Sequence, residues 1–161
     1  MSISSSVARS ESGRSFIQGL VATKPGWGGL VLRLGLAVML WPHGAQKLLG
    51  WFGGYGFEGT MALMTQSGIP APVAFLVIVG EFFAPILLVA GFLTRFAAAS
   101  VAVIMAGAAL MVHLPNGFFA DKGGLEFPML AVFAALALVF SGAGSGSVDL
   151  RMTRGGLRAE G

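Results

Sequence analysis

Four stretches of this chain are long and apolar enough to cross a lipid bilayer as α-helices. A spanning helix needs about 20 mostly apolar residues, because it rises about 1.5 Å per residue across a hydrocarbon core of roughly 30 Å. The stretches cover residues 27–50, 72–92, 96–114 and 124–141. We therefore predict an all-α fold in which residues 27–141 form an integral membrane bundle of four transmembrane helices.

The composition agrees with lipid as the solvent of this bundle. Hydrophobic residues make up 55% of the chain and charged residues only 11%, well below the roughly 25% of soluble domains. A net charge of +3 would suggest nucleic-acid binding in a soluble protein, but here the basic residues lie at the ends of the apolar stretches. We expect the lipid bilayer as a partner and no nucleic acid.

The distribution of basic residues predicts the orientation. Loops and tails on the cytoplasmic side of a membrane protein carry an excess of lysine and arginine. Four crossings place both ends on one side, and that side has eight basic residues against two, namely Arg9, Arg14, Lys24, Arg33, Arg95, Arg151, Arg154 and Arg158 against Lys47 and Lys122. We predict a cytoplasmic N-terminal tail, residues 1–26, and a cytoplasmic, flexible C-terminal tail, residues 142–161, which begins with a run of glycine and serine.

Two interpretations are open for the outer loop, residues 51–71. One is a half-buried helix at the membrane interface, with an apolar face made of Phe57, Met61, Leu63 and Met64. The other is a plain glycine-rich connector.

Ionisable side chains inside the apolar stretches are candidates for function, because each costs about 2.5–3.5 kcal/mol at the centre of a bilayer. Five of them fall in the outer half of the predicted bundle, and together they come from all four helices: His43, Lys47, Glu81, His113 and Glu126. We expect these five to converge on one polar pocket. Arg33 lies near the inner edge, and we expect it to form an ion pair with Glu81 or to reach the inner interface.

Purely structural explanations stay open beside this interpretation. Arg33 and Lys47 lie near helix ends and could extend their charges to the interface. His113 and Glu126 could be ordinary helix-end residues, since a carboxylate complements the amino end of a helix. His43 follows a proline, which frees a backbone carbonyl that an imidazole could satisfy.

The chemistry of the five residues suits a quinone headgroup. Two imidazoles, two carboxylates and an amine can donate and accept protons in a dry pocket, and quinone reduction moves two protons together with the electrons. Trp41 and Phe82 could flank the headgroup, although aromatic residues at such positions are often interface anchors.

Other cofactors fit this sequence less well. The chain contains no cysteine, so it cannot ligate an iron–sulfur cluster. The histidines and glutamates do not occur at the spacings typical of metal sites, and we expect no metal. The estimated depths of His43 and His113 differ by roughly 5 Å, so we do not expect a haem between them.

Residues 29–150 contain a series of short motifs, namely Leu32-Arg33-Leu34-Gly35, His43-Gly44-x-x-Lys47, Gly80-Glu81-Phe82, Gly91-x-x-Thr94-Arg95, His113 with Asn116-Gly117-Phe118, Gly124-Leu125-Glu126, and Gly142-x-Gly144-x-x-Ser147-x-Asp149. Together these motifs resemble the DoxX family of small bacterial and archaeal membrane proteins. The resemblance implies a four-helix, multi-pass protein of the bacterial cytoplasmic (inner) membrane. It also implies a link to quinone-dependent oxidoreductases such as thiosulfate:quinone oxidoreductase, although no residue here points to thiosulfate.

We therefore predict a membrane subunit of a quinone-linked oxidoreductase system that binds a quinone headgroup in the outer half of the bundle. A redox partner protein must supply the electrons, and whether this chain is itself catalytic stays open. One alternative is a small proton-coupled transporter, which four helices build more easily as a homodimer. The other is a structural or assembly factor of a membrane redox complex, whose buried ion pairs only fix the helix register.

Overall fold

The structure, a computed structural model, describes residue 19 and residues 22–159, apart from the side chains of residues 155–159. Within these residues every regular element is helical, which confirms the all-α prediction. The elements are α2 (Trp27–Leu49), η1 (Trp51–Gly53), α3 (Gly56–Gln66), α4 (Ala71–Ala90), α5 (Thr94–Ala108), η2 (Ala109–His113), η3 (Leu114–Asn116), η4 (Ala120–Lys122), α6 (Glu126–Ser141) and α7 (Val148–Ala159). Residues 1–18, 20 and 21 of the predicted N-terminal tail lie outside the described residues.

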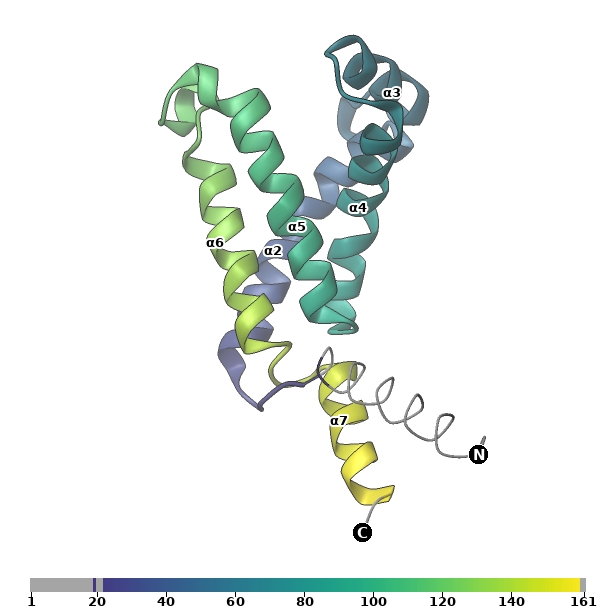
Figure 1. The fold of residues 1–161 in the computed structure, drawn as a ribbon, viewed down its shortest axis with the longest axis vertical. Helices are drawn as coiled ribbons and strands as arrows, with labels where there is room; N and C mark the ends of the chain where they lie inside the picture. Colours follow the sequence, from purple (N-terminus) through teal and green to yellow (C-terminus); the bar gives the residue numbers. More distant parts are fainter. Residues whose placement is uncertain (1–18, 20–21, 160–161) are drawn as a thin grey trace, which may run out of the picture.

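The long helices form two pairs. Helix α2 packs mainly on α4 and α5 mainly on α6, while contacts between α4 and α5 join the pairs. Figure 1 shows the pairs close together near α7 and diverging toward α3 and the loop between α5 and α6. Following the predicted orientation, we call the end with α3 the outer end and the end with α7 the inner end.

Small residues let the helices approach closely in the core, as is usual in membrane bundles. The core is a cluster of apolar side chains from α2, α4, α5 and α6, which includes Leu36, Leu40, Leu88, Ala97, Ala98, Val101, Ala135 and Leu138. The outward faces of the same helices are also apolar, with Val31, Val103 and Leu130 exposed. A helix that is apolar on all sides is typical of a lipid environment.

By length and composition, two helical segments could cross a membrane, Ala71–Ala90 and Thr94–Asn116. The second is α5 continued through η2 and η3. Helix α6 is apolar but shorter, and α2 carries Arg33, His43 and Lys47 within its 23 residues. Four crossings and cytoplasmic ends therefore stay predictions.

The inner turn between α4 and α5 depends on a glycine. Gly91 ends α4 in the left-handed region at φ 62°, and an added Cβ would lie 2.5 Å from the Cβ of Ser147. The turn is completed by backbone hydrogen bonds from Gly91 to Leu88 and from Phe92 to Leu87. Only a residue without a side chain fits both this backbone conformation and this close approach.

The C-terminal segment differs from the flexible tail expected for residues 142–161. Six residues between 142 and 150 are buried against the inner end of the bundle, namely Gly142, Ala143, Gly144, Ser147, Asp149 and Leu150. Helix α7 then begins at Val148, where the Ser147 hydroxyl accepts a hydrogen bond from the Leu150 N–H at 3.2 Å. The flexible-tail prediction is wrong for this segment, because its serine and glycine residues serve as a helix cap and close-packed loop.

The outer loop contains α3, so its helical interpretation is confirmed over the plain connector. Phe57 and Leu63 are exposed on this helix, whereas Met61 and Met64 are half-buried. The loop folds back tightly, since a Cβ on Gly54 would lie 2.2 Å from the carbonyl oxygen of Gln46.

Candidate functional site

An ion pair links α2 and α4, the two helices of the first pair. The ammonium group of Lys47 in α2 donates a hydrogen bond to Oε2 of Glu81 in α4. The Glu81 side chain is only 3% exposed, whereas that of Lys47 is 33% exposed. The site thus combines a buried carboxylate with a cation that is accessible from one side.

The backbone of α2 and α4 brings these two side chains together. A Cβ on Gly44 would lie 2.4 Å from the carbonyl oxygen of Glu81 and 2.7 Å from the Cα of Phe82, so the helices touch through their backbones here. Lys47 follows Gly44 by one helical turn and lies on the same side of α2. Pro85 cannot donate a hydrogen bond to the Glu81 carbonyl, which keeps that oxygen outside the regular ladder of α4.

Aromatic rings from both helices surround this crossing. The rings of Trp41 and Phe82, the two residues predicted to flank a headgroup, lie 6.1 Å apart between centroids. Trp41 also packs edge-on against Trp51 of η1 at 5.9 Å, and Phe82 against Phe83 at 5.1 Å. These contacts, worth about 0.5–1.5 kcal/mol per pair, stiffen the outer half of the α2–α4 pair.

His43 lies close to the ion pair along α2 but takes no part in it. It precedes Lys47 by four residues on α2 and therefore shares its helical face. Its side chain is exposed, and it forms no hydrogen bond or ion pair within the described part of the chain. An imidazole on an exposed face of a predicted membrane helix is available to a ligand or a partner.

His113 and Glu126 lie at the outer end of the other helix pair. Nδ1 of His113 lies 2.6 Å from the carbonyl oxygen of Gly123, and the Glu126 carboxylate accepts a hydrogen bond from the Ala120 N–H at 3.0 Å. Both side chains therefore hold the loop between α5 and α6, which Figure 1 shows away from α3 and α4.

The structure divides the five predicted site residues between two places. Lys47 and Glu81 are in contact, His43 is close along the same helix, and His113 and Glu126 are attached to the other pair. The described residues include no group of three histidine or acidic side chains close enough to hold a metal ion. The convergence expected from all four helices is not found, because the two pairs diverge toward the outer end.

Of the two alternatives predicted for Arg33, the ion pair with Glu81 does not form, and the side chain instead binds backbone carbonyls at the inner end of the bundle. Its buried guanidinium donates to the carbonyl oxygens of Leu88 at 2.9 Å and Val89 at 2.6 Å, and to those of Ser145 at 3.1 Å and Gly146 at 2.6 Å. The last carbonyls of a helix have no partner within that helix, and they lie at the depth of Arg33. Glu81 lies seven residues from Leu88, about 10 Å further along α4.

Two further contacts at the inner end were not expected from the sequence. The buried Asp149 carboxylate accepts hydrogen bonds from the N–H groups of Leu93 at 2.8 Å and Thr94 at 2.9 Å, and so caps α5. Arg95 donates to the carbonyl oxygens of Val139 and Phe140 at the end of α6. Ser147 with Asp149 two residues later is a recognisable signal for the start of a helix. Nothing in the sequence, however, indicates that Asp149 caps α5.

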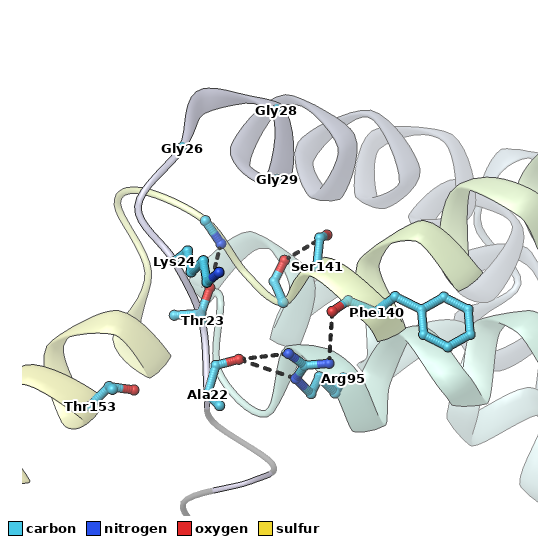
Figure 2. Close-up of a pocket in the computed structure, with 12 residues that line it drawn as sticks. Ala22, Thr23, Lys24, Gly26, Gly28, Gly29, Arg95, Phe140, Ser141 and Thr153 are labelled. Carbon is cyan, nitrogen blue, oxygen red and sulfur yellow. Dashed lines mark hydrogen bonds between the residues drawn. The ribbon is translucent and has the colours of Figure 1, made fainter.

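A hollow of about 700 Å³ lies at the inner end (Figure 2). Its described wall is formed by the residues before α2, the starts of α2 and α5, the end of α6, the segment between α6 and α7, and one residue of α7. The lining residues are Ala22, Thr23, Lys24, Gly26, Gly28, Gly29, Arg95, Phe140, Ser141, Gly142, Gly144 and Thr153. None of these described lining residues is acidic.

Comparison with known protein families assigns the chain. The family model described as DoxX matches residues 28–114, which is more than half of the 161 residues. The chain belongs to the DoxX family. The match contains Arg33, the Gly44–Glu81 crossing, the Lys47–Glu81 ion pair and His113, and it confirms the resemblance found in the sequence motifs.

This DoxX chain is also similar to two curated proteins. An uncharacterized protein of Haemophilus influenzae is 35% identical over 82 residues, which cover 50% of this chain and 54% of the relative. A Bacillus subtilis protein named "Putative oxidoreductase CatD" is 27% identical over 115 residues, which cover 71% of this chain and 79% of the relative. The chain thus spans about half the length of the Haemophilus protein. No solved structure matches it at a significant level.

Proposed function

We propose that this DoxX chain is a membrane subunit of a quinone-linked oxidoreductase system and that a quinone headgroup binds beside Lys47 and Glu81. The observation that supports this most is the ion pair itself, in which a carboxylate that is 3% exposed is joined to a lysine that is 33% exposed. The open side of the ammonium group can donate a hydrogen bond to a carbonyl oxygen of the ligand, while Glu81 is held away from solvent.

The proposed chemistry follows from what a quinone needs. Reduction to the quinol takes two electrons and two protons, one proton on each oxygen. Lys47 would donate a hydrogen bond and a proton to one oxygen while the Glu81 carboxylate holds the ammonium in place, and the exposed imidazole of His43 on the same face of α2 is the nearest candidate for a second proton donor. A redox partner protein supplies the electrons in this proposal, and the name of the Bacillus relative supports an oxidoreductase role.

The proposed site is smaller than the one predicted from the sequence. It uses the first helix pair and the aromatic residues Trp41 and Phe82, and it leaves out His113 and Glu126, which hold the loop of the other pair. The site lies in the outer half of a four-crossing bundle with cytoplasmic ends, in the bacterial cytoplasmic (inner) membrane. These features of topology and location are part of the proposal.

Quinone retention by purified protein tests the proposal. Organic extracts of wild type, Glu81→Gln and Glu126→Gln, all purified in mild detergent, are analysed for ubiquinone and menaquinone by mass spectrometry. We expect near-stoichiometric quinone in wild type and in Glu126→Gln, and a loss of at least about tenfold, or 1.4 kcal/mol, in Glu81→Gln. An empty wild-type extract, with no binding when ubiquinone-1 is titrated, would exclude a quinone site in this chain.

A structural role is the second candidate, and the close crossing of Gly44 and Glu81 favours it. An ion pair at the tightest contact between two helices can simply fix their register. In that case wild type would hold no quinone and the two charges would affect stability alone, so removing both together would leave stability nearly unchanged although each single removal lowers it. A transport role would instead appear as proton flux in proteoliposomes that Glu81→Gln abolishes.

A further inference from the structure

The inner hollow is separate from the Lys47–Glu81 site, and the charged residues among its described lining are all basic. These are Lys24 and Arg95, and the rest of the described lining consists of small, polar or apolar residues. A volume of about 700 Å³ falls within the range of small-molecule sites, roughly 300–1,000 Å³. Glycines form much of the described wall, and two of them, Gly26 and Gly28, are exposed.

The two cationic side chains, Arg95 and Lys24, differ in whether they already form hydrogen bonds. Arg95 is engaged, because its guanidinium donates to the carbonyl oxygens of Ala22 at 2.9 Å and Phe140 at 3.1 Å, as Figure 2 shows. Lys24 is exposed and forms no hydrogen bond or ion pair within the described part of the chain. The hollow thus has one positive charge that is fixed in its wall, on Arg95, and one exposed lysine, Lys24, that can bind an anion.

The surroundings indicate which kind of anion fits. The exposed Trp27 (75%) and Phe140 (78%) lie next to the hollow, where aromatic side chains commonly anchor a protein at the membrane interface. Helix α2 begins here without a side-chain cap, so its first N–H groups also favour negative charge. Basic pockets between membrane helices on the cytoplasmic side are typical sites for anionic lipid headgroups.

We infer that this hollow binds the phosphodiester headgroup of an anionic membrane lipid, with Lys24 as its mobile cation and Arg95 as a fixed part of the wall. The acyl chains extend past Phe140 and Trp27 into the bilayer. The inference does not depend on a quinone at Lys47 and Glu81, because the two sites lie at opposite ends of α2.

Native mass spectrometry with defined lipids tests this inference. Wild type, Lys24→Gln and Lys122→Gln are purified in mild detergent and titrated with phosphatidylglycerol or phosphatidylcholine. Lys122 is the matched control, since it is an exposed lysine in the loop between α5 and α6. We expect wild type and Lys122→Gln to retain phosphatidylglycerol in preference to phosphatidylcholine, and Lys24→Gln to retain about fivefold less phosphatidylglycerol, the effect of one lysine near an anionic lipid.

Three results would overturn the inference. The first is equal retention of phosphatidylglycerol by Lys24→Gln and wild type, and the second is no preference of wild type for phosphatidylglycerol over phosphatidylcholine. The third comes from adding excess inorganic phosphate as a soluble competitor. Displacement of the lipid by inorganic phosphate, together with stabilisation of wild type by that ion alone, would assign the hollow to a soluble phosphate instead.

Discussion

Gly44 of α2 lies against the carbonyl group of Glu81 in α4 with no room between them for a methyl group. This one backbone contact sets the distance between the two helices, and it brings the Lys47 ammonium, one turn later, to the buried carboxylate. The short motif His43-Gly44-x-x-Lys47 therefore has a geometric meaning. Gly44 permits the close approach of the two helices, and Lys47 can therefore reach the Glu81 carboxylate.

Replacing this glycine should separate the helices. In Gly44→Ala the new methyl group would meet backbone atoms, which cannot move aside as a flexible side chain can. We expect a loss of about 1–3 kcal/mol of stability, typical of overpacking. Gly35→Ala is the matched control, because a Cβ there meets nothing within 4 Å. Thermal unfolding in detergent, followed by circular dichroism, measures both, and an unchanged midpoint in Gly44→Ala would contradict the close crossing.

The two members of the ion pair should respond differently to single substitution. Lys47→Met leaves the buried Glu81 carboxylate without its cation and should cost about 2–4 kcal/mol. Glu81→Gln should cost less, about 1 kcal/mol, since the partly exposed Lys47 can turn toward solvent. The double variant Lys47→Met with Glu81→Leu should recover much of the loss. Equal costs for both single variants, measured by the same unfolding assay, would argue against this asymmetry.

Asp149 should be needed for the stability of the bundle although it follows the last long helix. Asp149→Ala removes the acceptor of the Leu93 and Thr94 N–H groups, and Leu93 is held at an unfavourable φ of 47°. We expect a loss of about 1–3 kcal/mol. Asp121→Ala, in an exposed turn, is the control.

A truncated chain that ends at Ser141 should purify poorly, and normal stability of either Asp149→Ala or this truncation would show that the inner contacts are dispensable.

Labelling of single cysteines tests the four crossings and their orientation. The chain has no native cysteine, so each introduced thiol reports alone. Ser67→Cys and Lys122→Cys should react with a membrane-impermeant maleimide in intact cells, because they lie at the predicted outer end. Arg154→Cys in α7 should react only after the membrane is opened. Labelling of all three from outside would exclude the predicted topology.

Much of the fold could be predicted because helices and their ends are encoded locally. The apolar stretch expected at residues 72–92 is the helix Ala71–Ala90, and that at 27–50 is Trp27–Leu49. Proline before α4 and glycine after it mark these ends through backbone conformations that depend on neighbouring residues alone. The DoxX motifs are likewise local strings of residues.

The candidate site was only partly predictable, because the partners of a charged side chain depend on its depth in the bundle and on the tilt of the helices relative to one another. Depth estimates along the helices placed Lys47, His113 and Glu126 together, yet such estimates ignore that the α2–α4 and α5–α6 pairs diverge. Lys47 reaches Glu81 because Gly44 allows the closest crossing of their helices nearby.

The sequence by itself determined the helical class, the positions of the four long apolar helices, the exclusion of cysteine chemistry and the family. The tertiary structure alone decided that Arg33 binds the end of α4, that Lys47 rather than Arg33 pairs with Glu81, and that the C-terminal segment caps α5. The physical reason is the range of the interactions. Hydrophobicity and turn propensity act within a few residues, whereas these hydrogen bonds join residues 34 to 56 positions apart, so they exist only once the helices have packed.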